Sequence, residues 1–338
     1  MLLHEHKDFK DLIATVSDNM GIDPTLVEKD YWIMHCLWGL QQQGFIFELK
    51  GGTSLSKGFG LIHRFSEDID IRIEPPVGID VKTGKNQDKE AHIKSRSAFY
   101  DWVASELKIL GIQDVVRDHA FDDSEKMRSG GVRLNYQSIM PSLGGLKDGV
   151  LLELGFDDTA PNQPVDISSW AYDYAIKYVK DIDDNRAKNV LCYLPEYTFV
   201  EKLQTISTKY RQYKDGKGFP KNFLRHYYDV YCLLDYPSVV EFIKTDRYQT
   251  RKVERFPKSD NLIISQNPAF LLSDSEDRKL FESEYQKVAS LYYKGQPNFP
   301  DLLNRISQHL KALEVNPFCS NEVLDGCSKI PLVLKTKE

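Results

Sequence analysis

The sequence predicts an α+β protein: a mixed-sheet domain with flanking helices, followed by a mainly helical domain. Three observations support this prediction. The 338 residues exceed one typical domain of roughly 100–200 residues. Short strand-like apolar segments occur between residues 45 and 154, and from about residue 195 the apolar spacing becomes helical. We therefore expect a first domain at residues 1–190, including N-terminal helices, and a helical domain at residues 191–338.

The first domain begins with a predicted helical stretch that extends to about residue 43, in which Asp23-Pro24 is typical of a helix start. Residues 45–49 form a short apolar run that ends at Gly51-Gly52, as expected for a strand entering a turn. Residues 68–73 alternate between polar and apolar side chains, which predicts a strand. The other predicted elements are a helix at 98–110, strands at 132–136 and 150–154, and a loop at 144–149 that connects these two strands.

The second domain is predicted from helical apolar spacing. Its predicted helices cover residues 195–212, 221–234, 281–293 and 300–313. Residues 246–270 are polar and include Pro257 and Pro268, so they are predicted to form a long connection.

The composition excludes several classes of protein. A formal charge of -6 argues against a protein that coats nucleic acid, although a local basic patch remains compatible with it. The 5 cysteines lack C-x-x-C spacing, so neither a disulfide framework nor a zinc site is expected. The N-terminus mixes acids and bases, and no apolar run approaches the roughly 18–20 residues of a membrane span. We therefore predict a cytoplasmic protein without membrane contact.

Asp68 and Asp70 are the strongest candidates for catalysis. Two residues apart on a strand, they point to the same face, and their repulsion favours a cation between them. Hard oxygen ligands suit Mg²⁺, with Mn²⁺ as an alternative, and such ions activate an attacking hydroxyl and stabilise a leaving pyrophosphate. A solvated strand face is the ordinary explanation of a lone D-x-D, so the surrounding residues decide between the two.

Two further features accompany the aspartates. The turn at Gly51-Gly52 allows close approach of backbone to a phosphate, and the helix that follows offers free N–H groups. A plain tight turn is the alternative. Glu153 lies in an apolar strand, where acids are rare unless they are paired or bound to metal. It is expected to complete a carboxylate triad; the alternative is an edge-strand glutamate or an internal salt bridge.

Spaced blocks of the sequence resemble the AbiEii/AbiGii toxin family of nucleotidyltransferases, part of the DNA polymerase β-like superfamily. The first blocks are Glu-Lys-Asp-Tyr-Trp at 28–32, Leu-Lys-Gly-Gly-Thr-Ser-Leu-Ser-Lys at 49–57 and Arg-Phe-Ser-Glu-Asp-Ile-Asp at 64–70. Residues 195–203 resemble the lysine helix of the family, and residues 225–231 its final arginine–aspartate motif. The resemblance implies a polymerase β-like fold for the first domain.

The resemblance also implies a set of site residues. The implied catalytic residues are Ser66, Asp68, Asp70, Lys202 and Asp229. The implied nucleotide-binding residues are Gly51, Gly52, Thr53, Ser54, Ser66 and Lys202, and the metal ligands are Asp68, Asp70 and Glu153. Ser66 is expected to donate its hydroxyl to a phosphate, and Lys202 to neutralise the departing pyrophosphate. Lys202 as a surface lysine, and Asp229 in a structural ion pair with Arg225, are the alternatives.

The family implies transfer of a nucleoside monophosphate from an NTP, with release of pyrophosphate. It further implies a toxin of a toxin–antitoxin or phage-defence system, a tRNA 3′ end as acceptor, and a cognate antitoxin encoded nearby. Basic residues interleaved with aromatics fit single-stranded RNA, although a solvated helix face is the alternative. These residues are Lys209, Arg211, Lys214 and Arg225. Transfer to a protein or a small molecule, and a non-catalytic nucleotide-binding module, are the competing hypotheses.

Overall fold

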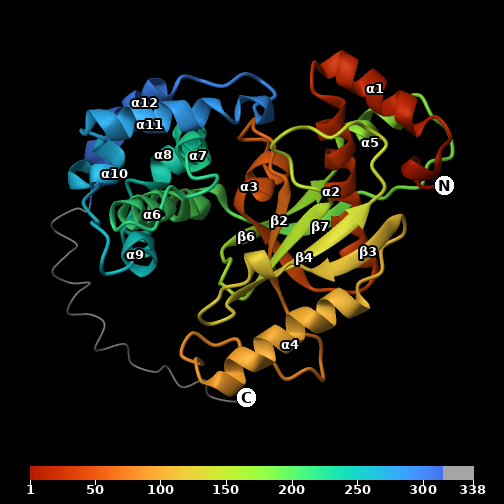
Figure 1. Cartoon of the computed structure of the whole chain (residues 1–338), viewed down its shortest axis with the longest axis horizontal. Helices are drawn as coiled ribbons and strands as arrows, with labels where there is room; N and C mark the ends of the chain where they lie inside the picture. The colour runs from red at the N-terminus through yellow and green to blue at the C-terminus, as the bar shows by residue number, and fades with distance from the viewer. Residues whose placement is uncertain (315–338) are drawn as a thin grey trace, which may run out of the picture. The chain divides into compact units, whose positions relative to one another are not determined.

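The computed structural model describes residues 1–314 (Figure 1). These residues form two compact units. The first unit contains Met1–Leu194 and Val288–Gln296, and the second contains Pro195–Lys287 and the chain from Pro297 onward. The boundary expected between residues 190 and 191 falls within strand β7 (Ala187–Tyr193). Residues 315–338 of the predicted second domain, with Cys319 and Cys327, lie outside the described residues.

A seven-stranded mixed sheet forms the centre of the first unit, in the order β3-β4-β5-β2-β1-β7-β6. Strand β2 is parallel to β5, β1 is parallel to β7, and the other neighbouring pairs are antiparallel. The mixed sheet with flanking helices confirms the predicted fold class. The strands are β1 (Phe47–Lys50), β2 (Asp68–Ile73), β3 (Ile112–Arg117), β4 (Ser129–Tyr136), β5 (Val150–Gly155), β6 (Asn162–Ile167) and β7.

One face of the sheet is apolar and lies in the core. Ile69 and Ile71 of β2 and Leu152 and Leu154 of β5 are fully buried, and the two strands pair Ile69 with Leu152. Helices α2 (Pro24–Gln42) and α4 (Glu90–Glu106) contribute side chains to the same core. Because side chains alternate along a strand, burial of the isoleucines directs Asp68 and Asp70 to the opposite face.

The helices of the first unit follow local capping signals. Asp23 accepts a hydrogen bond from the backbone N–H of Thr25 at 2.9 Å, and Pro24 occupies the first turn, which confirms the predicted start of α2. Helix α4 spans Glu90–Glu106 and not residues 98–110. Its first turns are polar, and Arg96 within them is buried and donates to backbone carbonyls. The others are α1 (Phe9–Met20), α3 (Gly51–Thr53) and α5 (Trp170–Ala175), with short turns η1 (Leu3–Glu5), η2 (Ser54–Gly58), η3 (His119–Phe121) and η5 (Ala289–Leu291).

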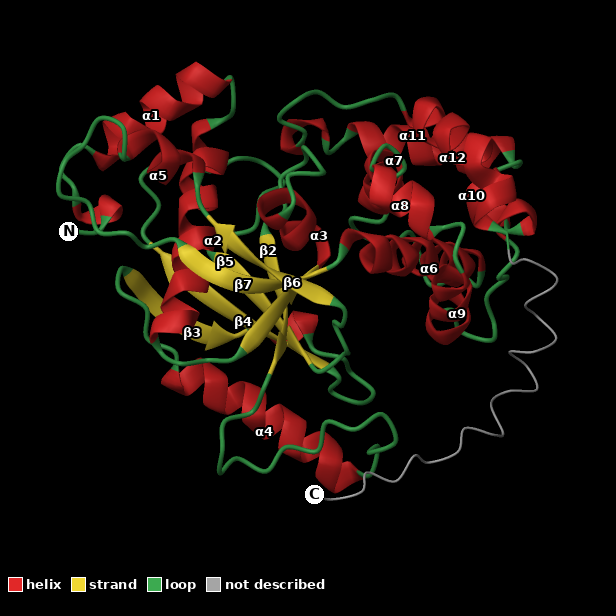
Figure 2. Ribbon diagram, turned by 180° about the vertical axis from the view of Figure 1, so that it is seen from behind, coloured by secondary structure: helices red, strands yellow, loops and turns green. Residues whose placement is uncertain are grey.

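The described part of the second unit is helical (Figure 2). Its elements are α6 (Pro195–Lys214), α7 (Arg225–Leu233), α8 (Pro237–Phe242), α9 (Asp246–Arg255), η4 (Ile264–Gln266), α10 (Pro268–Leu271), α11 (Ser275–Gln286) and α12 (Phe299–Leu313). The prediction of a long connection at residues 246–270 is wrong, because α9 occupies its first part. The buried face of α9 carries polar side chains, including Gln249, Arg251 and Lys252, so its apolar periodicity is weak.

Residues 288–296 return to the first unit and hold the segment that precedes β2. The backbone N–H of Phe65 donates to the carbonyl of Leu291 at 2.7 Å, and Tyr293 Oη donates to the carbonyl of Ile62 at 3.2 Å. Arg64 also forms a β-bridge with Tyr292. The approach to Ser66 and Asp68 is therefore fixed by residues more than 200 positions later in the sequence.

Candidate active site

Asp70 lies at the centre of a row of residues that crosses the polar face of the sheet. The strand register pairs Asp70 with Lys50 on β1 and with Glu153 on β5, and Gly131 on β4 pairs with Glu153. Asp68 faces the same side because it lies two residues before Asp70 on β2. The sheet thus gathers the acids predicted from the sequence on one face.

The turn after β1 packs against this row through two glycines. Gly51 has a φ of 72°, in the left-handed region that favours glycine, and a Cβ there would collide with the carboxylate of Asp70. A Cβ on Gly52 would lie 2.5 Å from Ser66 Oγ. Gly51 therefore requires glycine, and a Cβ at Gly52 would displace the hydroxyl of Ser66. Both positions bring the turn backbone close to predicted catalytic side chains.

Thr53 and Ser54, which were predicted to bind nucleotide, use their hydroxyls inside the protein. Thr53 Oγ1 donates to the carbonyl of Asp68, and Ser54 Oγ donates to the carbonyl of Tyr193 at 3.3 Å. Both residues are fully buried. Their side chains therefore fix the turn to β2 and β7, and a phosphate would have to be met by other groups of the turn.

Asp68 forms an ion pair with a lysine that no sequence motif indicates. Lys147 Nζ lies 2.9 Å from Oδ1 and 2.8 Å from Oδ2 of Asp68. The Asp68 side chain is 5% exposed and that of Lys147 22%. Lys147 lies in the glycine-rich loop between β4 and β5, which the sequence pattern marks only as a connection. Its role comes from the tertiary structure and has no local signal.

Glu153 holds a proton more tightly than an ordinary glutamate. Burial raises its pKa to about 8, and the negative charges of Asp70 and Asp68 act in the same direction. The ammonium of Lys147 lowers the pKa of Glu153, but by less. Glu153 is therefore mostly protonated at neutral pH, which limits the repulsion among the three neighbouring acids.

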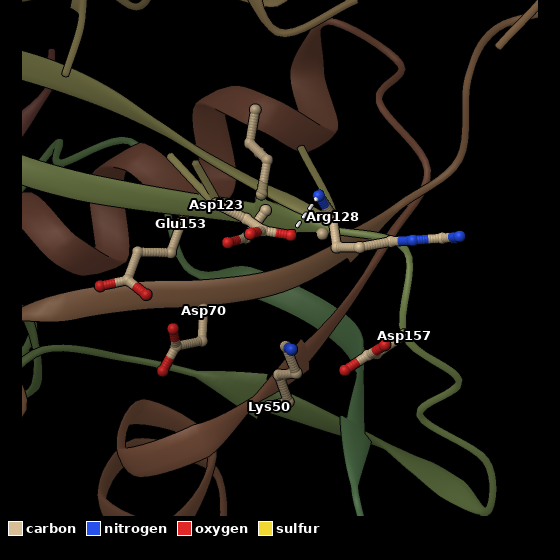
Figure 3. A pocket seen from close by; sticks show the side chains of 9 residues that line it. Lys50, Asp70, Asp123, Arg128, Glu153 and Asp157 are labelled. Atoms are coloured by element: carbon tan, nitrogen blue, oxygen red, sulfur yellow. Dashed lines mark hydrogen bonds between the residues drawn. The ribbon is translucent and has the colours of Figure 1, made fainter. Parts of the chain in front are cut away.

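A cavity of about 300 Å³ opens beside the row (Figure 3). Asp70 and Glu153 line it from neighbouring strands, together with Lys50. The guanidinium of Arg128, which also lines the cavity, pairs with Asp88 at 2.5 Å. The side chains labelled in Figure 3 are Lys50, Asp70, Asp123, Arg128, Glu153 and Asp157. The charged lining suits a polar ligand better than an apolar one.

The second unit contains the other predicted catalytic pair. Lys202 on α6 and Asp229 on α7 form an ion pair, with Nζ 3.0 Å from Oδ2. The Asp229 side chain is fully buried and that of Lys202 is 10% exposed. Lys202 is therefore not a surface lysine, and its ammonium is held by Asp229.

The basic stretch expected to bind RNA is partly neutralised by acids. Arg211 Nε lies 2.6 Å from Asp260, and Lys214 Nζ lies 2.8 Å from Asp277. Both acids have almost fully buried side chains, so these pairs stabilise the second unit. The Nε atom of Arg225 is buried and without a hydrogen-bond partner among the described residues. Two of the four predicted RNA-binding residues, Arg211 and Lys214, therefore already have acidic partners within the second unit.

Comparison with protein families gives a match over most of the chain. The matching family model is described as nucleotidyl transferase AbiEii toxin, type IV TA system, and it covers residues 38–305. The chain belongs to the AbiEii nucleotidyltransferase toxin family. The matched range includes every predicted catalytic residue and parts of both units. No curated protein and no solved structure matches the chain.

Membership of the AbiEii family has two general consequences. The protein is a nucleotidyltransferase toxin of a type IV toxin–antitoxin system, so a cognate antitoxin is implied. Within residues 1–314, no helix combines the length and apolar character needed to cross a membrane.

AbiEii chemistry also implies a divalent metal ion. No group of three His, Cys, Asp or Glu side chains within residues 1–314 is arranged to hold a metal. However, Asp68 and Asp70 present hard oxygen donors on one face, and Mg²⁺ requires only one or two carboxylates when phosphates supply further ligands. Lys147 already places a positive charge on Asp68. The residues present therefore fit a divalent cation that binds together with a nucleotide.

Proposed function

We propose that this AbiEii toxin transfers a nucleoside monophosphate from an NTP to the 3′ end of tRNA in the cytoplasm, with Mg²⁺ as cofactor. The observation that carries the proposal is the placement of Asp68 and Asp70 on one face of β2, against the Gly51-Gly52 turn. A phosphate needs such backbone access, and pyrophosphate departure needs positive charge beside it.

The two aspartates would hold Mg²⁺, which supplies charge stabilisation for the phosphates and lowers the pKa of the attacking hydroxyl. Mn²⁺ is expected to replace it. Glu153, next to Asp70 on β5, is proposed as the third ligand once it has lost its proton. The turn at Gly51 and Gly52 and the hydroxyl of Ser66 are proposed to position the phosphates.

Lys202 is proposed to neutralise the charge of the departing pyrophosphate. Its ion pair with Asp229 holds the ammonium at a fixed position on α6. Asp229 is then a positioning residue. The tRNA acceptor is supported by the resemblance to toxins that modify tRNA and by the basic, aromatic stretch on α6 and α7. The members of that stretch to test are Lys209, Arg211, Lys214 and Arg225, of which Arg211 and Lys214 also pair with buried acids.

Incubation of the full chain with Mg²⁺, each α-labelled NTP and total RNA tests the proposal. We expect label in the tRNA band and a loss of at least about 1000-fold in Asp70→Asn, because the metal site loses a charged ligand. Asp114→Asn, at an exposed position of β3, is the matched control and should retain activity.

The competing hypotheses give different results in the same experiment. Label in protein or in a small molecule would contradict the tRNA acceptor but keep the transferase activity. Nucleotide binding without transfer under all these conditions would favour a non-catalytic module. Removal of metal with EDTA should abolish transfer, and Mg²⁺ should restore it.

A further inference from the structure

Lys147 forms an ion pair with Asp68, the carboxylate that the proposed function assigns to a metal ion. Its ammonium contacts both oxygens of Asp68, at 2.9 and 2.8 Å, so both are engaged by one positive charge. Two of the strongest ligand atoms of the site therefore already have a cationic partner. The pair lies on the polar face of the sheet, beside Asp70 and Glu153.

The loop that carries Lys147 is anchored through its backbone. The backbone N–H of Lys147 donates to Glu67 at 2.9 Å, and its carbonyl accepts from the ammonium of Lys29 at 2.5 Å. Lys29 is almost fully buried and also pairs with Glu67 at 3.7 Å. These contacts do not involve the Lys147 side chain. The loop can therefore keep its place when that side chain is replaced or moves.

A second anchor holds the start of the same loop. The buried carboxylate of Glu28 accepts from the backbone N–H groups of Ile139 and Met140, at 2.9 and 3.1 Å, and from Ser138 Oγ at 2.9 Å. Buried acids are stabilised by such charge-assisted bonds. Glu28 and Lys29 are adjacent residues of α2, and they fix both ends of residues 138–147, the segment that places Lys147 beside Asp68.

The Lys147 side chain itself is free to exchange. Its ammonium lies 4.6 Å from the centre of the Phe121 ring and is partly exposed, with a flexible four-carbon stem. The ammonium can turn from Asp68 into solvent, but the carboxylate of Asp68 is only 5% exposed and would remain as a buried charge unless another cation replaced Lys147. A divalent cation accompanied by nucleotide phosphates brings both the charge and the ligands needed to displace it.

We propose that Lys147 and the divalent cation compete for Asp68, so that the metal enters with the nucleotide and binds weakly without it. Lys147 is then a positioning residue that balances the charge of Asp68 between turnovers. This inference rests on the proposed function, because it requires a metal at Asp68.

Titration of the full chain with Mn²⁺ in the absence of nucleotide, followed by electron paramagnetic resonance, tests the competition. We expect Lys147→Met to tighten Mn²⁺ binding about tenfold, equivalent to about 1.4 kcal/mol. Lys147→Gln also removes the positive charge and should tighten Mn²⁺ binding as well, so it replaces Lys147→Met if the methionine disturbs the loop. Lys147→Arg keeps the positive charge and should bind Mn²⁺ as weakly as the natural protein. Lys94→Met, on the exposed face of α4, is the control and should change nothing.

Two outcomes would overturn the inference. One is unchanged or weaker Mn²⁺ binding in Lys147→Met and Lys147→Gln when circular dichroism shows both to be folded. The other is an equal gain from Lys147→Met in an Asp68→Asn background, because the competition would then not involve Asp68. If Mn²⁺ binding depends on Asp68 and Asp70 but not on Lys147, only this inference fails. Absence of Mn²⁺ binding in every variant, with and without NTP, would also contradict the proposed function.

Discussion

The two units each contain a lysine–aspartate ion pair that involves a predicted catalytic acid, and the two pairs differ in kind. Lys202 and Asp229 project from helices α6 and α7, with side chains 10% and 0% exposed. Lys147 projects from a loop, and its side chain is 22% exposed beside Asp68. Similar chemistry thus occurs once on a rigid, buried support and once on a loop.

The difference indicates what each pair is suited to do. A buried pair on two packed helices is costly to break, because either charge alone would remain in a medium of low dielectric. A partly exposed lysine on a loop can be replaced by another cation. The Lys202–Asp229 pair therefore suits a fixed positive charge, and the Lys147–Asp68 pair suits an exchangeable one.

The largest effect on stability is expected when the helical pair is broken. Asp229→Asn keeps the shape of the side chain but removes the charge that accompanies the buried ammonium of Lys202. We expect a loss of about 3–5 kcal/mol in the free energy of unfolding, measured by urea denaturation. Asp301→Asn, at an exposed position of α12, is the control. If Asp229→Asn lost no more stability than Asp301→Asn, the Lys202–Asp229 pair would not be the buried structural pair described above.

Breaking the loop pair should cost far less. Asp68→Asn leaves Lys147 able to turn into solvent and removes one of three repelling acids. We expect the free energy of unfolding to change by at most about 1 kcal/mol, although transfer activity is lost. Urea denaturation of this variant beside Asp229→Asn measures the contrast directly. A loss as large as in Asp229→Asn would mean that Lys147 is also a permanent structural partner.

His35 is a buried titratable residue, and it makes the stability of the first unit depend on pH. Burial lowers the pKa of His35 to about 4, and its ring contacts the carbonyl of Leu110 at 2.7 Å and the amide of Asn185 at 2.9 Å. The folded pKa lies below the unfolded value of 6.5, so stability is complete above pH 6.5 and falls as pH decreases toward 4. At pH 5 the loss attributable to His35 is about 2 kcal/mol.

Urea denaturation at pH 7 and pH 5 measures this dependence. His35→Gln retains a donor and an acceptor but does not titrate, so the difference between the two pH values should shrink. It should not vanish, because burial also lowers the pKa of His4, whose ring centre lies 4.9 Å from that of His35. An undiminished difference in the variant would contradict the assignment to His35.

The smallest effect is expected at an exposed helical pair. Lys94 and Glu90 on α4 lie 2.6 Å apart, but both side chains are more than 70% exposed. Lys94→Ala should change the free energy of unfolding by no more than about 0.5 kcal/mol in the same urea experiment. A larger change would show that the exposure of an ion pair does not by itself determine its contribution to the free energy of unfolding.

The sequence was sufficient for features that depend on local periodicity. The alternation at residues 68–73 predicted that Asp68 and Asp70 share a face, because the face of a strand is determined by its pattern of burial. The acid in the apolar strand at 150–154 led to the expectation that Glu153 joins them, and the register places it beside Asp70. The start of α2 at Asp23-Pro24 followed from capping chemistry. Comparison with the family confirmed the resemblance that the Gly51-Gly52 turn and the aspartates first indicated.

Features that depend on distant contacts were not predictable. Lys147 is 79 positions from Asp68, and a glycine-rich loop gives no indication of which acid its lysine meets. Helix α9 was missed because its buried face is polar, and strands β6 and β7 were missed because their exposed residues interrupt the apolar pattern. Apolar periodicity in a sequence indicates which side chains face solvent, whereas these elements are stabilised by contacts with specific distant residues.

The return of residues 288–296 to the first unit limits how the toxin can be dissected. A fragment that ends at Leu194 keeps all strands of the seven-stranded sheet and both aspartates. It lacks Leu291 and Tyr293, which hydrogen-bond the chain just before Ser66. The chain thus passes between the two units three times, at residues 194–195, 287–288 and 296–297, so the helical unit is not a simple C-terminal appendage. Cleavage of the chain between the units, or early termination of translation, removes a support of the sheet domain as well as the helices.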